Sequence, residues 1–115
     1  MFSSSTHIEV FSKIENENFL IKLIEQLNKD FQMANVSESI ADTLLISVVN
    51  DRLNEILLSL ITNHYDDYLN LLYRIDISEN ELATIKGTDL KENINEVAFL
   101  IIKREFQKVW FKSRI

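Results

Sequence analysis

Residues 90–112 read LKENINEVAFLIIKREFQKVWFK, and their apolar side chains recur at spacings of three and four. At about 100° per residue these positions share one arc of roughly 180° on a helix. The arc consists of Leu90, Ile94, Val97, Ala98, Ile101, Ile102, Phe106 and Val109. Its edge and far side carry Phe99, Leu100, Trp110 and Phe111. The pattern predicts a helix with more apolar surface than one buried face can hold.

The composition excludes most alternatives to a helical fold. The chain has 115 residues, enough for a single domain over residues 1–115 but not for two cores. It contains one glycine, Gly87, and neither proline nor cysteine. Disulfides, cysteine zinc sites, thiol nucleophiles and glycine-rich phosphate loops are therefore excluded. Folds of many strands joined by Gly and Pro turns are disfavoured for the same reason.

Amphipathic spacing predicts three helices upstream of residue 90. They cover residues 17–34, 37–62 and 63–75, with Ser37 and Asn63 as N-caps of the second and third.

Two shorter segments complete the expected fold. Ser78 opens a capping box, and the short helix that follows ends at Gly87 in a left-handed conformation. Residues 1–17 form an irregular arm or a short helix, with capping boxes at Thr6 and Ser12. We expect an all-α, antiparallel helical bundle of four main helices, one short helix and an N-terminal arm.

The charge distribution is uneven along the chain. The formal net charge is −6, which disfavours nucleic acid as a partner. Residues 103–115 nevertheless hold five basic side chains against Glu105 alone. No signal peptide is evident, and the longest apolar run, Val97–Ile102, is far shorter than the ~20 residues that span a bilayer. We expect a cytoplasmic protein without a membrane partner.

The sequence contains few motifs that are typical of catalysis or metal binding. His64 is followed by Asp67 and Tyr68 on one helix face, but the HExxH pattern of zinc sites is absent. The paired carboxylates fall in first helical turns, where they complement the helix dipole. As an alternative, a cavity near Tyr65, Tyr68 and Tyr73 would bind a small ligand or a metal. We expect no enzyme, no catalytic residue, no metal and no cofactor.

Two charged residues fall where apolar ones are expected. Arg52 projects from the side of Leu45 and Val48, and Glu105 lies within the apolar arc of residues 90–112. A buried charge must be paired, because leaving it alone costs several kcal/mol. We therefore predict a buried ion pair between Arg52 and Glu105. The alternatives are an exposed Glu105 beyond the end of the core, and a site or interface lined by Arg52, Glu105 and Tyr73 or Arg74.

The C-terminal segment is the strongest candidate for an interaction surface. Trp110 and Phe111 diverge by about 100° and cannot both face the core. We predict a protein-binding or self-association surface with these two rings as anchors and Arg104 and Lys108 as rim charges. Two alternatives stay open: an interface to nucleic acid or an anionic surface, and core packing with cations at the negative end of the helix dipole.

Two stretches, residues 71–79 (LLYRIDISE) and 101–109 (IIKREFQKV), resemble a group of small uncharacterised all-helical bacterial proteins. The likeness covers roughly the last 50 residues and includes no catalytic motif. It implies a stand-alone bacterial cytoplasmic protein, and it suggests that Tyr73-Arg74 and Arg104-Glu105 act together.

Overall fold

The computed structural model describes residues 6–114, and this part of the chain is helical without a strand. It folds as the all-α helical bundle that the sequence predicts. The helices are α1 (His7–Asn16), α2 (Leu20–Met33), α3 (Ile46–Asn63), α4 (Tyr65–Ile75), α5 (Glu79–Leu82) and α6 (Leu90–Lys112).

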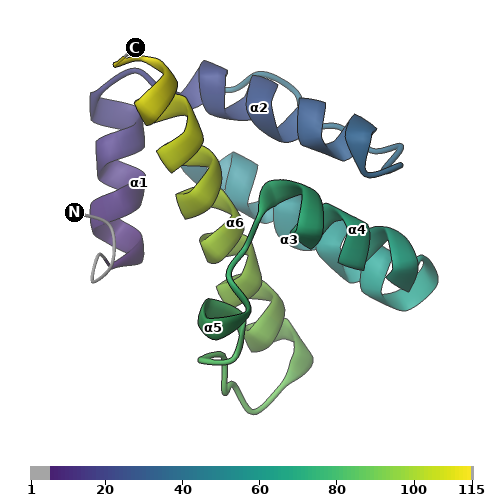
Figure 1. Cartoon of the computed structure of the whole chain (residues 1–115). Helices are drawn as coiled ribbons and strands as arrows, with labels where there is room; N and C mark the ends of the chain where they lie inside the picture. Colours follow the sequence, from purple (N-terminus) through teal and green to yellow (C-terminus); the bar gives the residue numbers. More distant parts are fainter. Residues whose placement is uncertain (1–5, 115) are drawn as a thin grey trace.

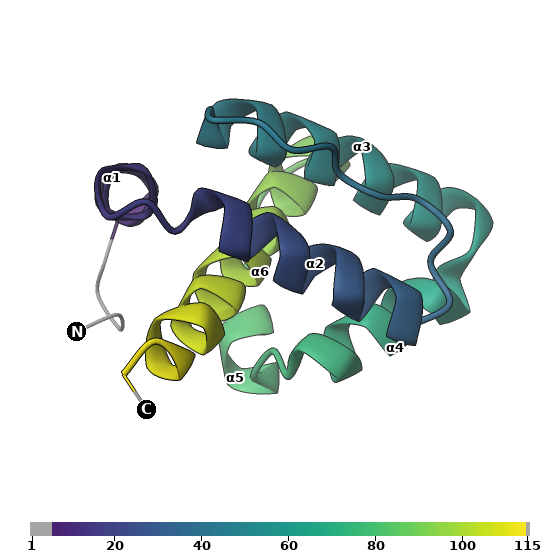
Figure 2. The same ribbon diagram turned by 90° about the horizontal axis from the view of Figure 1, so that it is seen from above.

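Helix α6 is the element around which the others are arranged. It packs against α1, α2, α3 and α4, and it crosses the last three at a wide angle (Figures 1 and 2). α3 and α4 form an antiparallel hairpin, and α4 also packs against α2. The short α5 lies beside the N-terminal half of α6 (Figure 1).

The central position of α6 explains its all-round apolar pattern. In its middle, side chains that point in nearly opposite directions, such as Phe99 and Ile101, are both buried. Phe99 lies outside the main apolar arc, but α1 covers it: the His7 ring stacks on the Phe99 ring with centroids 3.8 Å apart. The neighbouring helices therefore absorb much of the apolar surface that appears surplus in the sequence.

Three helices end on a left-handed residue that is not glycine. Asn18, Asn35 and Asp76 have φ angles of 60°, 65° and 70°. After α2, for example, Val36 N–H donates to Phe31 O at 2.9 Å and Asn35 N–H to Gln32 O at 3.2 Å, which is a Schellman ending. Asn and Asp tolerate this backbone conformation better than other side chains, so a chain with a single glycine can still turn sharply.

The predicted helix over residues 37–62 is wrong in its first part, because α3 begins only at Ile46. Residues 36–43 have no helix, and Ser37 caps nothing. The side chain of Asn28 holds this segment in place: Nδ2 donates to Ile40 O at 2.9 Å, and Oδ1 accepts from Ile40 N–H at 2.8 Å. Val36 and Ile40 are buried in this conformation. A long-range contact thus overrides the local helical pattern.

The remaining boundaries agree with the sequence more closely. α4 begins after His64, one residue beyond the predicted Asn63 cap, and ends at Ile75 as predicted. Ser78 caps α5, but α5 ends at Leu82 and Gly87 is not left-handed, so that prediction is corrected. A Cβ at Gly87 would clash with the Asn93 side chain, which would have to move to accommodate it.

Residues 7–16 of the expected N-terminal arm are the helix α1. The Thr6 side chain accepts from Glu9 N–H at 3.2 Å, which selects the first of the two predicted capping boxes. Val10 and Ile14 anchor α1 in the core. The part of the predicted arm over residues 1–5 lies outside the described residues.

Candidate functional site

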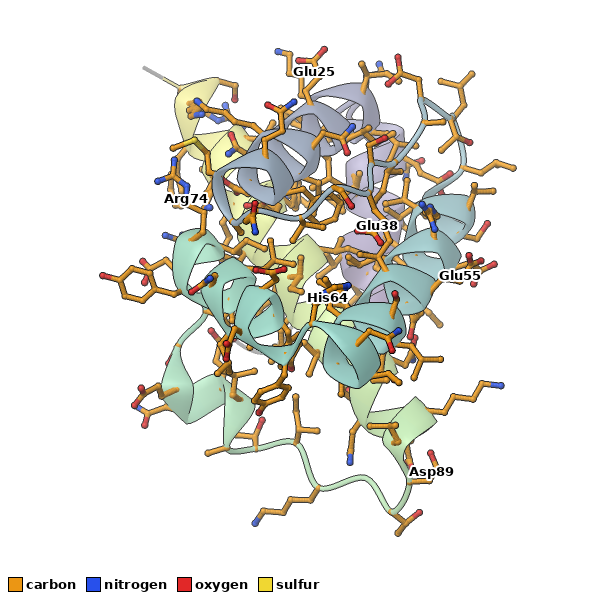
Figure 3. The ribbon with its side chains drawn as sticks, turned by 90° about the vertical axis from the view of Figure 1, so that its right-hand side faces the viewer. Glu25, Glu38, Glu55, His64, Arg74 and Asp89 are labelled. Carbon is orange, nitrogen blue, oxygen red and sulfur yellow. The ribbon has the colours of Figure 1, made fainter. Side chains whose placement is uncertain are left out.

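Two carboxyl groups meet in the interior where α2 crosses α6. Asp30 and Glu105 are both buried, and Glu105 has no exposed surface. Lys108 Nζ lies 3.0 Å from Asp30 Oδ2 and 3.0 Å from Glu105 Oε1. Arg74, which projects from α4 (Figure 3), places its Nε 3.5 Å from Asp30 Oδ1. One charged cluster therefore joins α2, α4 and α6.

The two carboxyl groups are in opposite protonation states near neutral pH. Burial, together with the hydrogen bond to Asp30 and its negative charge, raises the pKa of Glu105 from 4.5 to about 8. Burial also acts to raise the pKa of Asp30, but hydrogen bonds from Glu105, Lys108 and Gln26 outweigh it and hold that pKa below 3.8. Glu105 is therefore the carboxyl group that keeps its proton near neutral pH.

Within residues 6–114, none of the pockets described below is lined by Asp30 or Glu105. The nearest described pocket, about 380 Å³ between α2 and the end of α6, is lined by Gln26 and Val109 but by neither carboxyl group. Acid–base catalysis requires a group within reach of a substrate. The geometry therefore favours a structural role for the charged cluster, in which Lys108 and Arg74 compensate the buried Asp30.

The predicted Arg52–Glu105 ion pair is not formed. Arg52 lies on the surface of α3 and pairs with Glu55 one turn later, with NH1 3.6 Å from Oε2. Glu105 is buried as predicted, but its cationic neighbour is Lys108 on its own helix. The sequence pattern identified the buried charge and assigned it the wrong partner.

Two predicted rim charges are already used within the chain. Lys108 is largely buried against Asp30 and Glu105 and is not a rim residue. Arg104 NH2 lies 3.4 Å from Asp76 Oδ2 at the end of α4. The suggestion that residues 73–74 and 104–105 act together holds in part, since Arg74 and Glu105 both contact Asp30.

The C-terminal end of α6 carries an aromatic cluster at the surface. The rings of Trp110 and Phe111 meet edge to face, with centroids 5.2 Å apart. Arg114 places its guanidinium carbon 4.2 Å from the centroid of the Trp110 ring. Trp110 is half-buried against the core, whereas Phe111 is 54% exposed. We call Trp110, Phe111, Lys112 and Arg114 the C-terminal surface.

Two pockets lie at opposite ends of α6. The pocket near the C-terminal end includes Lys22, Lys29 and Lys112 in its lining. The pocket near the N-terminal end is a groove of about 520 Å³ between α3 and α6. Its lining consists of Asp51, Asn54, Glu55, Leu58, Leu90, Lys91, Ile94 and Asn95. We call it the α3–α6 groove.

The tyrosines and the histidine that could bind a ligand or a metal do not all line one pocket. Tyr68 is buried, Tyr73 is almost fully exposed, and the polar pocket beside Tyr65 is lined by neither of them. His64 lies at the turn between α3 and α4 (Figure 3) and lines the same pocket as Tyr65. Within residues 6–114, no three His, Asp or Glu side chains gather closely enough to hold a metal ion.

Asp30 is the site residue that the sequence interpretation missed, although a signal was present. It follows Leu23 by seven residues and Leu27 by three, so it falls on the apolar face of α2. A carboxylate in that position, like Glu105 on α6, indicates a buried group that needs a cation.

Comparisons with family models, curated proteins and solved structures find no match to this chain. The fold and the site geometry are therefore the basis for any assignment. None of the helices within residues 6–114 combines enough length with enough apolar character to span a lipid bilayer.

Proposed function

We propose that this protein is a non-enzymatic interaction module whose contact surface is the C-terminal surface, with a second copy of the chain as its partner. The observation that carries the proposal is the exposed Phe111 ring, which is held edge to face by Trp110. Aromatic and Arg side chains are the residues that most often contribute large binding energies in protein interfaces. A bacterial, cytoplasmic setting belongs to the same proposal.

Charge supports a copy of this chain as the partner. Residues 1–102 carry an excess of acidic side chains, whereas residues 103–115 are basic. Arg104 and Lys108 are paired internally, so Lys112 and Arg114 are the cations that accompany the exposed ring. Opposite charges on two copies attract each other and favour encounter of the basic end with an acidic region.

The non-enzymatic part of the proposal rests on the charged cluster. Asp30 and Glu105 are the two carboxyl groups with shifted pKa values, and they are buried against Lys108 rather than placed in a pocket. Their role in joining α2 to α6 needs no substrate.

Sedimentation velocity from micromolar to millimolar protein tests the proposal. We expect concentration-dependent association of the wild type and at least ~10-fold weaker association of Phe111→Ala. Tyr65→Ala is the matched control, because Tyr65 is also 54% exposed and packs on a neighbouring ring, that of Tyr68. A wild type that stays monomeric, or equal association of the wild type and Phe111→Ala, would reject the proposal.

A second candidate function is binding of an anionic ligand or nucleic acid, and the pocket lined by Lys22, Lys29 and Lys112 favours it. Such binding must weaken steeply with salt, because counterions are released. Titration of single-stranded RNA and DNA at low and high salt tests this function, with Lys29→Glu as the variant. An absence of binding at low salt excludes it.

A further inference from the structure

We propose that the α3–α6 groove of one copy receives the C-terminal surface of the next, so that the chain associates head to tail. This inference rests on the proposed function and names the receiving site. Phe111 of one copy occupies the apolar floor formed by Leu58 and Leu90 of another.

The groove has the size and the chemistry for an aromatic side chain. Its volume of about 520 Å³ lies within the range of pockets that hold ligands of drug size. Leu58 and Leu90 are about half exposed there, and Ile94 closes the floor. Exposed apolar side chains that line a concave surface gain free energy when an apolar ring removes them from water.

The charges around the groove are opposite to those of the C-terminal surface. The groove lining contributes two carboxylates, Asp51 and Glu55, against one cation, Lys91. Lys112 and Arg114 beside Phe111 carry the complementary positive charge. This pairing favours the C-terminal surface over an acidic segment as the occupant.

The groove and the C-terminal surface of the same molecule cannot meet. Both lie on α6, and at about 1.5 Å per residue Asn95 and Phe111 are roughly 24 Å apart along a rigid helix. Asp89 lies at one end of the molecule and the C-terminus of α6 at the other, as Figures 1 and 3 show. The occupant must therefore come from a second copy.

The two surfaces differ from each other, so the contact is heterologous. A heterologous contact leaves one free groove and one free C-terminal surface on every dimer, and further copies add until a ring closes or a filament grows. A contact between two C-terminal surfaces would instead stop at a dimer. The stoichiometry of association thus distinguishes the two arrangements.

The experiment uses two single variants of the full chain and their mixture, measured by sedimentation velocity. Leu58→Glu blocks the groove, and Phe111→Ala removes the docking ring. The matched control for Leu58→Glu is Leu69→Glu on α4, because the two leucines are 47% and 46% exposed. Far-ultraviolet circular dichroism confirms that each variant is folded.

We expect each variant alone to associate at least ~10-fold more weakly than the wild type. The mixture is expected to form a one-to-one dimer and nothing larger, because Leu58→Glu supplies an intact C-terminal surface and Phe111→Ala an intact groove. The Leu69→Glu control is expected to associate like the wild type.

Three results would overturn the inference. If Leu58→Glu associates like the wild type while Phe111→Ala does not, the C-terminal surface binds elsewhere, and the proposed function survives without the groove. If the mixture stays monomeric, the groove and the ring are not partners. A monomeric wild type would overturn both this inference and the proposed function.

Discussion

Residues 103–108 and residues 110–114 contain the same mixture of aromatic and basic side chains, but they have opposite environments. In the first region Glu105 and Phe106 are fully buried, and Lys108 serves as the counter-charge of the buried Asp30 and also contacts Glu105. In the second, only Trp110 packs against the core. A basic and aromatic sequence pattern therefore does not by itself predict an exposed surface, because the neighbouring helices determine which of its side chains are covered.

The largest expected effect is on the pH dependence of stability, through Glu105. The unfolded chain loses the Glu105 proton near pH 4.5, whereas the folded protein keeps it until about pH 8. The unfolded state therefore binds fewer protons in this window, and rising pH favours unfolding. One pKa unit corresponds to about 1.4 kcal/mol, so wild-type stability should fall by several kcal/mol across the window.

Urea denaturation of Glu105→Gln between pH 5 and 8 checks this expectation, since the neutral amide removes the titration. The variant should show a much flatter dependence than the wild type. Asp30 acts in the opposite direction: its contribution is present above pH 3.8 and is lost as pH falls through its lower folded-state pKa. Equal slopes for wild type and variant would show that Glu105 is ionised in the folded protein.

The next effect is the loss of the interior cation. Lys108→Met should reduce the free energy of unfolding by about 3 kcal/mol, because it leaves Asp30 with Arg74 as its only basic partner. Lys112→Met is the control, since Lys112 only donates to Gln26 at the surface, and it should cost about 0.5 kcal/mol or less. Similar losses for the two variants would contradict the contrast between the two regions.

The two rings of the C-terminal surface should differ in the same way. Trp110→Ala should cost about 2 kcal/mol, since the half-buried ring packs against the core, whereas Phe111→Ala should cost about 0.5 kcal/mol or less. Thermal unfolding of both variants at low protein concentration measures this difference without contributions from association. A large loss for Phe111→Ala would show that the ring supports the fold rather than a contact.

The smallest effect is expected at Arg104. Its ion pair with Asp76 is partly exposed, so Arg104→Ala should change stability by about 0.5 kcal/mol or less. Salt should weaken even this contribution. Denaturation of wild type and variant at low and high salt provides the measurement, and a loss comparable to that of Lys108→Met would place Arg104 in the interior network.

The sequence predicts those parts of the fold that depend on local signals. The caps at Thr6 and Ser78 and the break near Asn63 are local, and the corresponding boundaries agree with the structure or differ by one residue. The extended segment after α2 was missed, because Asn28 holds Ile40 across twelve residues of sequence. Local helix and turn propensities do not predict a contact between residues this far apart in the sequence.

In the charged cluster, too, only the features that depend on local sequence could be predicted. Glu105 could be identified as buried from its place in the apolar arc, and its i,i+3 spacing to Lys108 was visible as well. Asp30 lies 78 residues from Lys108, so their meeting depends on how α2 crosses α6. The predicted partner of Arg52 is Glu105, but Glu55, one turn away on the same helix, provides the pairing carboxylate.

The Asn28 amide has a further consequence for local opening. The Asn28 side chain uses its donor and its acceptor on the backbone of one residue, Ile40, as a residue of a neighbouring β-strand would. Local opening of residues 36–43 must break both hydrogen bonds and expose the buried Val36 and Ile40, while the helices can stay folded. The backbone amide of Ile40 should then exchange with solvent deuterium through this local opening, at a rate independent of the unfolding of the core.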